Sequence, residues 1–296
     1  MTNQTDLPTT SPQMPRFAVL QLSGCSGCEV SLLNADEWLF EYQLVYMPLV
    51  ISSQTIPEDI EVLLVTGGVR NEEDEYRLIQ AASMAQKVVA VGTCAISGGV
   101  ANLGDRDEVR KLFSSGTKRH ALPALLPNTH PVDAVVNVDL YLPGCPPTPE
   151  LFIAALTNDP NFKPASIVCV ECGRKKLSDM KPDHLSGFQS GTVLPDICLV
   201  NQGYLCLGIS TRGGCRALCT RPGHPCVGCR GPSDAFIEKE SHVWLENVKR
   251  VFSRMTNVPP EEVLKELKSP QLSLFLDQFS DYEGGNRLPR DKTKVL

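Results

Sequence analysis

The sequence has no long hydrophobic run and no excess of basic residues. No apolar stretch approaches the roughly eighteen residues that would span a bilayer, so we predict no transmembrane segment. A net charge of −6 over 296 residues argues against a nucleic-acid partner, because binding to phosphates requires a basic face. Residues 1–15 have neither a basic n-region nor an apolar h-region, and they predict a disordered extension instead of a secretory signal. These absences favour a cytoplasmic protein.

Familiar catalytic groupings are also missing. No Ser-His-Asp grouping stands out, and no phosphate-binding lysine accompanies Gly67 and Gly68, which predict a turn. Arg70, just after that turn, is expected to face solvent or another subunit. A hydrolase and a nucleotide-binding enzyme are therefore both disfavoured.

Cysteine, in contrast, is abundant, with twelve residues in the chain. A reducing cytoplasm disfavours disulfides, and so many free thiols would invite oxidation unless they had a ligand role. The count divides into three sets of four, which is the number of thiolates that hold one 4Fe-4S cluster. Metal binding is the favoured explanation, but the spacing of the cysteines has to support it.

The first half of the chain alternates short apolar runs with helical patterns. This alternation predicts an α/β fold with a flavodoxin-like, doubly wound parallel sheet. The strands are expected at residues 17–22, 43–50, 62–66, 88–91 and 134–140, and the helices at 29–40, 72–86 and 105–113. In such sheets, ligands bind where the strands end and the loops lead into the helices.

Near residue 158 the alternation of strand and helix patterns gives way to a stretch rich in glycine and cysteine, and Asn-Asp-Pro breaks a helical pattern there. We expect the sheet domain to span 16–158 and a small, loop-rich domain that depends on metal to span 159–235. A helical extension and tail would occupy 236–296. Helices are predicted at 234–255, 260–267 and 272–279, followed by an exposed arm from 281 to 296.

Four cysteines lie at predicted strand ends of the first domain. They are Cys25 and Cys28 in LSGCSGCE, Cys94 in VGTCAISGG and Cys145 in LPGCPPTP. A parallel sheet would bring these loops together at one edge, so the four thiolates are predicted to share a cluster. A thioredoxin-like dithiol at Cys25 and Cys28 is the alternative, and it leaves the other two unexplained. Glu29 would either stabilise a helix N-terminus or take part in proton movement.

Eight further cysteines lie between residues 169 and 229. They are Cys169, Cys172, Cys198, Cys206, Cys215, Cys219, Cys226 and Cys229. The last four fall within fifteen residues, close enough to surround one cluster. Their C-x2-C pairs are equally typical of zinc sites, so a zinc-stabilised interaction module remains open.

Together, LSGCSGCE, VGTCAISGG, LPGCPPTP, CVECG, QGYLCLG, TRGGC and PCVGCRGP closely resemble the small subunit of nickel-iron hydrogenases. The match covers roughly residues 16–235 and is most similar to the cytoplasmic F420-non-reducing hydrogenase and sulfhydrogenase delta type. The resemblance implies an electron-transfer subunit that is not catalytic alone. It also implies a proximal 4Fe-4S cluster on Cys25, Cys28, Cys94 and Cys145, a medial cluster on Cys215, Cys219, Cys226 and Cys229, and a distal cluster on Cys169, Cys172, Cys198 and Cys206.

Two positions depart from the membrane-bound and periplasmic members of that family. Those members usually have histidine where this chain has Cys169 and proline where it has Cys219, and the proline leaves a 3Fe-4S medial centre. With cysteine at both positions, all three clusters are expected to be 4Fe-4S and to have low potentials. The implied partners are a hydrogenase large subunit and a further flavin or iron-sulfur acceptor subunit. A quinone-proximal cluster subunit of the complex I type is the related alternative, and the C-x-x-C pair and the second cysteine-rich region argue against it.

Overall fold

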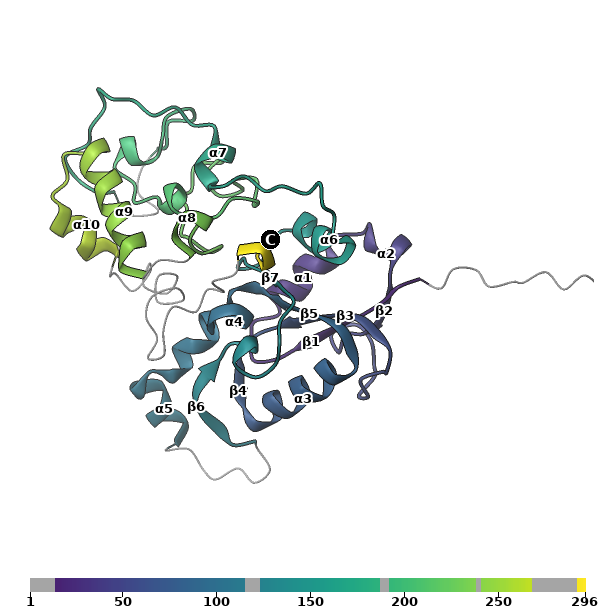
Figure 1. Ribbon diagram of the computed structural model, residues 1–296. Coiled ribbons are helices and arrows are strands. Elements are labelled where there is room, and N and C mark those ends of the chain that lie inside the picture. The colour runs from purple at the N-terminus through teal and green to yellow at the C-terminus, as the bar shows by residue number, and fades with distance from the viewer. Residues whose placement is uncertain (1–13, 115–122, 187–191, 238–240, 268–291) are drawn as a thin grey trace, which may run out of the picture.

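A five-stranded parallel sheet forms the centre of the first domain. The computed structural model describes residues 14–114, 123–186, 192–237, 241–267 and 292–296 (Figure 1). The sheet contains β1 (Arg16–Gln21), β2 (Gln43–Tyr46), β3 (Ile60–Thr66), β5 (Ala85–Val91) and β7 (Leu140–Leu142). Their order is β2-β1-β3-β5-β7 and every pair is parallel, which is the flavodoxin-like arrangement. The predicted fold class is confirmed.

Alternating side chains of the central strands are buried on both faces of the sheet. Phe17, Val19 and Leu64 belong to one cluster, and the intervening Ala18 and Leu63 to the other. Parallel sheets are covered on both faces, which explains the continuous apolar runs of their strands. The first cluster lies under α1 (Gly27–Leu33), α2 (Trp38–Glu41) and α6 (Pro149–Thr157), and the second under α3 (Glu72–Ser83) and α4 (Gly92–Ser97) (Figure 1).

Three predicted elements differ from the structure. The expected strand at 43–50 ends at Tyr46, because Pro48 has no amide for the ladder. The expected helix at 29–40 is divided into α1 and α2 around residues 34–37, and the Trp38 indole donates to the carbonyl of Leu32 at 3.2 Å. The expected strand at 134–140 begins only at Leu140, since the Asp139 carboxylate accepts the Val88 amide at 2.8 Å in place of a main-chain carbonyl.

A short antiparallel pair outside the main sheet was not predicted. It joins β4 (Val69–Asn71) to β6 (Leu125–His130). Between α4 and β6 lie a 3-10 segment (Gly99–Asp105) and α5 (Asp107–Ser114). This layer borders the edge of the sheet that carries Cys25 and Cys94.

Loops with few regular elements make up the cysteine-rich part of the chain. They contain α7 (Val168–Cys172) and short 3-10 turns at Val200–Gln202 and Leu207–Ile209. A further 3-10 turn at Val132–Ala134 belongs to the sheet domain. The helices α8 (Asp234–Ile237), α9 (Ser241–Met255) and α10 (Pro260–Leu267) follow. Val248 and Phe252 of α9 are fully buried in the same cluster as Leu199 and Leu207, so α9 covers the cysteine-bearing loops.

The last two residues of the chain pack against the sheet. Lys292–Lys294 form a 3-10 turn, Val295 bridges Tyr141 in parallel, and the Leu296 amide donates to the Tyr141 carbonyl at 3.0 Å. The predicted exposed arm is therefore wrong for Val295 and Leu296, which are half-buried, whereas Thr293 and Lys294 are exposed. Residues 281–291 of the arm and the predicted helix at 272–279 lie outside the described residues. Most of the predicted disordered segment, residues 1–13, lies outside them as well.

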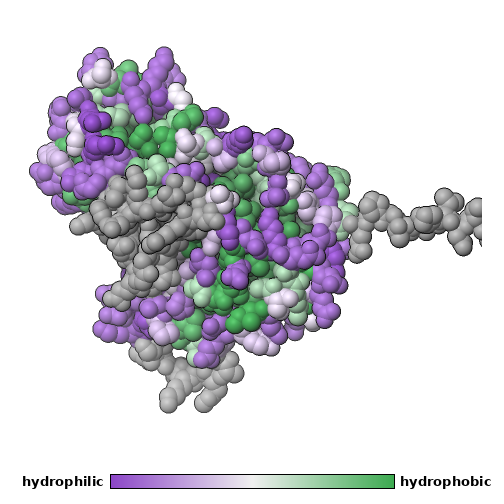
Figure 2. All heavy atoms as spheres, in the orientation of Figure 1, coloured by the Kyte–Doolittle hydropathy of each residue, from purple (hydrophilic) through white to green (hydrophobic). Residues whose placement is uncertain are grey.

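Hydrophilic residues predominate on the face drawn in Figure 2, with hydrophobic residues reaching the surface of both lobes between them. Among the described residues, no helix combines the length and the apolar character needed to cross a bilayer.

Candidate metal centres

The structure brings the four cysteines of the sheet domain to one pocket. Cys25, Cys28, Cys94 and Cys145 line it together with Gly24, Gly27, Thr66, Gly67 and Gly144. Each follows the carboxyl end of β1, β5 or β7, where adjacent parallel strands deliver their loops to one edge. The strand-end reasoning therefore placed these four residues correctly in space.

Burial changes the acid-base behaviour of these thiols. Burial raises the pKa of Cys28 well above its usual value, and charges on Glu29 and Cys94 act in the same direction. Burial also raises the pKa of Cys145 to about 12, followed by charges on Cys94 and Cys229. The unliganded thiols of Cys28 and Cys145 are thus protonated at neutral pH, so a metal bound by them must displace those protons.

A second pocket gathers the four cysteines nearest the end of the cysteine-rich region. Cys215, Cys219, Cys226 and Cys229 line it with Thr148, Val168 and Arg230. Cys145 lines this pocket as well as the first one. Burial raises the pKa of Cys229 to about 11 and the main-chain amide of Cys145 acts against this, so the two pockets are directly adjacent.

The remaining four cysteines form a third group. Burial raises the pKa of Cys169 to about 11 against the effect of Lys176, and nearby Cys198 and Cys172 raise it further. Burial likewise raises the pKa of Cys206 to about 12, with charges on Cys169 and Cys198 contributing. The Cys226 amide donates to Cys206 Sγ at 3.3 Å, which places this third group beside the second.

Main-chain conformation and a carboxylate shape the loop between Cys215 and Cys219. Arg216 and Ala217 both have positive φ, at 55° and 54°. Glu171, which lies between Cys169 and Cys172 in α7, accepts the amides of Gly214 at 2.5 Å and Ala217 at 3.2 Å. Glu171, which lies in the helix that carries two cysteines of the third group, therefore fixes the loop that carries Cys215 of the second group.

The comparisons with known proteins agree with this arrangement. Residues 25–158 match a family model described as "NADH ubiquinone oxidoreductase, 20 Kd subunit". Over 242 residues the chain is 37% identical to a vhu-type F420-non-reducing hydrogenase subunit of Methanocaldococcus jannaschii, covering 75% of this chain and 84% of that protein. It is 28% identical to the F420-non-reducing hydrogenase iron-sulfur subunit of Archaeoglobus profundus, covering 73% and 82%. It is also 28% identical to the sulfhydrogenase 2 subunit delta of Pyrococcus furiosus, covering 86% and 98%.

The chain belongs to the small-subunit family of nickel-iron hydrogenases. The predicted resemblance is confirmed: the chain is a hydrogenase small subunit, and the relative from Archaeoglobus profundus is itself named an iron-sulfur subunit. The family model named after a complex I subunit matches the sheet domain alone, whereas the hydrogenase relatives extend across the cysteine-rich region.

The residues around the small subunit's cysteines fit four-thiolate clusters. A Cβ at Gly92, where φ is +80°, would lie 2.5 Å from Cys28 Sγ, and a Cβ at Gly99 would lie 2.8 Å from Cys94 Sγ. All twelve cysteines lie in the described residues, and none forms a disulfide. In the described parts of the chain, no three His, Cys, Asp or Glu side chains converge tightly enough for a single metal ion.

One buried hydroxyl of the small subunit also bears on the fit. Thr148 is 7% exposed and lines the second pocket, yet its Oγ1 has no hydrogen-bond partner among the described residues. It is the N-cap of α6 but makes no side-chain cap. A cluster sulfide in the pocket would give this hydroxyl a partner, which supports the fit.

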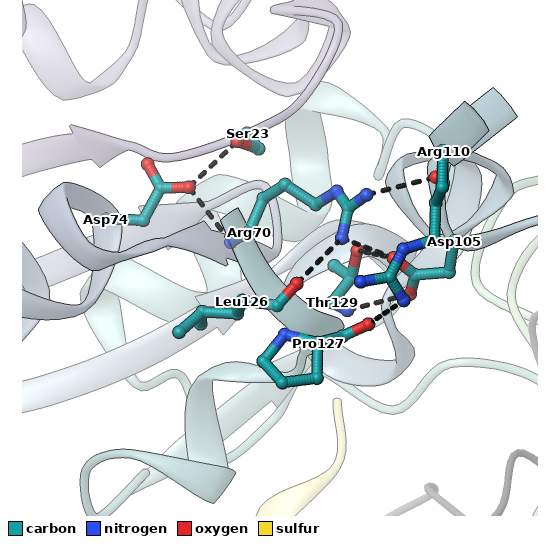
Figure 3. Close-up of polar contacts among 9 residues, drawn as sticks. Ser23, Arg70, Asp74, Asp105, Arg110, Leu126, Pro127 and Thr129 are labelled. Carbon is teal, nitrogen blue, oxygen red and sulfur yellow. Dashed lines mark hydrogen bonds and ion pairs between the residues drawn. The ribbon is translucent and has the colours of Figure 1, made fainter. Parts of the chain in front are cut away.

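A polar network supports the first pocket from the side of β4 (Figure 3). Arg70 forms an ion pair with Asp105 and donates to the Gly104 carbonyl at 3.0 Å. Asp74 accepts the Ser23 hydroxyl at 2.8 Å and the Arg70 amide at 2.9 Å. The prediction that Arg70 faces solvent is wrong, because its side chain is only 12% exposed and contacts Asp105 and the Gly104 carbonyl, while Asp74 holds the loop that leads to Cys25.

Glu29 faces the first pocket from the first turn of α1. It is 2% exposed and accepts a hydrogen bond from the Thr66 hydroxyl. Both alternatives raised for Glu29 remain compatible with this position.

Proposed function

We propose that the chain relays electrons through three 4Fe-4S clusters that lie in the order proximal, medial, distal. The proximal ligands would be Cys25, Cys28, Cys94 and Cys145, the medial ligands Cys215, Cys219, Cys226 and Cys229, and the distal ligands Cys169, Cys172, Cys198 and Cys206. The adjacency of the three groups carries this proposal. Cys145 lines both the proximal and the medial pocket at the first junction, and the Cys226 amide donates to Cys206 Sγ at 3.3 Å at the second.

In this relay the protein residues bind and surround the clusters and do not themselves carry the electrons. The clusters supply one-electron redox chemistry when bound, while the cysteines ligate them and the surrounding glycines leave room for their sulfides. Thiolate at Cys169 and Cys219 adds negative charge and a fourth ligand, which favours low reduction potentials. We therefore also propose a low-potential flavin or iron-sulfur acceptor subunit as a second partner. The exposed Val170 and Leu218, each next to proposed ligands, offer apolar surface for such a contact.

The domain division predicted above, with segments 1–15, 16–158, 159–235 and 236–296, fits this assignment. The proximal set lies in the second segment and the other two sets lie in the third. A cytoplasmic location also stays a prediction, which cell fractionation tests.

Metal analysis of the anaerobically purified full-length chain tests the cluster assignment. We expect about twelve iron and about twelve sulfide per chain. Cys219→Pro should remove one iron, to about eleven, and give a 3Fe-4S electron paramagnetic resonance signal at the medial site. The exposed neighbour Leu218 supplies the control, because Leu218→Ala should keep all twelve. Zinc in place of iron, or an unchanged spectrum in Cys219→Pro, would refute the assignment.

A further inference from the structure

Arg230 is the largest fully buried side chain among the residues that the structure describes. It is 1% exposed, follows Cys229 directly, and lines the medial pocket beside Cys215, Cys226 and Cys229. Gly214 packs against its guanidinium, since a Cβ at Gly214 would lie 3.1 Å from Nη2. A permanently charged group thus lies within the wall of the proposed medial site.

The guanidinium joins segments that lead to two different clusters. Its Nη1 donates to the Pro143 carbonyl at 2.5 Å, and its Nε donates to the Gly213 carbonyl at 2.8 Å. Pro143 lies two residues before Cys145, and Gly213 lies two residues before Cys215. Nη2 donates to the main-chain oxygen of Leu296 at 2.9 Å, which ties in the segment beside β7. One planar donor group therefore sets the position of the Cys145 loop relative to the Cys215 loop.

Among the described residues, no side-chain carboxylate forms an ion pair with Arg230, whereas the neighbouring buried Arg212 pairs with Asp234 at 2.5 Å. Burial lowers the pKa of Arg230 to about 10 and the charge of Arg212 acts in the same direction, while the charges of Cys215, Cys229 and Glu171 raise it. A guanidinium buried in a site of low polarity acts strongly on nearby negative charge.

We propose that Arg230 is a positioning residue that fixes the Cys145 loop against the Cys215 loop, and that its charge raises the reduction potential of the medial cluster. The inference rests on the proposed function, because it takes the medial ligands as assigned there. Reduction adds one electron to the cluster, and a fixed cation stabilises that added charge. The low potential favoured by the twelve thiolates is therefore partly offset at the medial site, between the proximal and distal clusters.

Redox titration of the full-length chain tests the inference, with Cys219→Pro as the background because its 3Fe-4S signal identifies the medial centre. Arg230→Gln removes the charge and should lower the equilibrium constant for medial reduction at least tenfold, a shift of about 59 mV to more negative potential for one electron. Arg230→Lys keeps the charge and should leave the equilibrium constant for medial reduction within threefold of the background value. Both variants are expected to lower thermal stability, since neither side chain can donate all three hydrogen bonds that Arg230 makes to main-chain oxygens.

Arg212→Gln is the matched control, because it removes a buried guanidinium that pairs with Asp234 and does not line the pocket. It should lower stability and move the medial potential less than Arg230→Gln does, because Arg212 lies near Arg230 but does not line the pocket. An unchanged potential in Arg230→Gln overturns the inference, and so does an equal shift in Arg230→Lys or loss of the medial centre in both Arg230 variants. Absence of the 3Fe-4S signal in Cys219→Pro alone would instead refute the proposed function.

Discussion

Glycine stands at the positions where a side chain would meet a cysteine sulfur. Gly92 begins α4 directly before Thr93 and Cys94, and its positive φ favours glycine over any residue with a Cβ. In this turn the Thr93 hydroxyl lies between two carbonyl oxygens, those of Gly144 at 3.1 Å and Cys229 at 2.9 Å, to which it donates. One small residue therefore lets the loops of Cys94, Cys145 and Cys229 approach one another.

Replacing Gly92 should disrupt the proximal cluster selectively. In Gly92→Ala the added Cβ would lie 2.5 Å from Cys28 Sγ, on a main chain that L-residues rarely adopt. We expect iron content to fall by about four per chain, as one four-iron cluster is lost. Gly104→Ala is the control, because its nearest contact would be an ordinary 3.6 Å to Arg70 and iron should remain unchanged. Equal iron content in both variants would contradict the prediction.

The Thr148 hydroxyl gives a second prediction for a single residue. If this buried hydroxyl donates to a sulfur of the medial cluster, Thr148→Val should shift the medial potential to a more negative value, and Thr148→Ser should not. The measurement is the same redox titration as for Arg230. Should Thr148→Val leave the potential unchanged, the hydroxyl is merely unsatisfied, and its removal would then be neutral or stabilising.

At the scale of elements, the long apolar strands were predictable and the short connecting pieces were not. β1, β3 and β5 are buried on both faces, so their composition alone identifies them, and their ends correctly place Cys25, Cys28 and Cys94. The pair of β4 and β6 joins segments more than fifty residues apart and is only a few residues long, so no local pattern indicates it. The start of β7 depends on the Asp139 side chain, a contact that sequence periodicity does not encode.

The start of α3 links one of these unpredicted pieces to the proximal site. Asn71, the last residue of β4, caps α3 by accepting the Asp74 amide at 2.9 Å, and the Asp74 carboxylate accepts the Ser23 hydroxyl. Asn71→Ala should lower the free energy of unfolding by about 1 kcal/mol, and Asn71→Ser, which keeps a capping oxygen, should retain most of it. Aspartate is not a suitable replacement, because the Asn71 amide also donates to the Asp74 carboxylate at 3.0 Å. Chemical denaturation of the full-length chain measures both. A cap without importance would give the two variants the same stability.

At the scale of the whole molecule, charged side chains connect the loops that carry one set of cysteines to the loops that carry the next set. Arg230 connects the loops of Cys145 and Cys215, and Glu171 connects α7 to the loop of Cys215. These contacts span between 17 and 87 residues, which is why the cysteine spacing alone could not reveal them. Predicted strand ends grouped the first four cysteines, but the sequence could divide the other eight into sets only by resemblance, whereas the contacts between segments give the sets a spatial order.

Arg174 makes the corresponding connection between the medial and distal regions. It lies two residues after Cys172, and its guanidinium donates to the carbonyls of Thr220 at 2.7 Å and Ile197 at 3.0 Å, which adjoin Cys219 and Cys198. Arg174→Ala should therefore loosen both loops at a cost of about 1–3 kcal/mol and speed the loss of medial and distal iron to a chelator. Proximal iron should be lost to the chelator no faster than from the unmodified chain, because no contact of Arg174 among the described residues reaches the sheet domain's cysteines.

Arg250 on α9 provides the control for this prediction. It is exposed, and its guanidinium donates to Asn247 within the same helix at 2.6 Å. Arg250→Ala removes the same charge from the same lobe and should change stability by no more than about 0.5 kcal/mol, with iron lost at the normal rate. If Arg174→Ala released iron equally fast from all three sites, Arg174 would stabilise the fold as a whole. The cluster regions would then be joined through their shared hydrophobic core and not through this arginine.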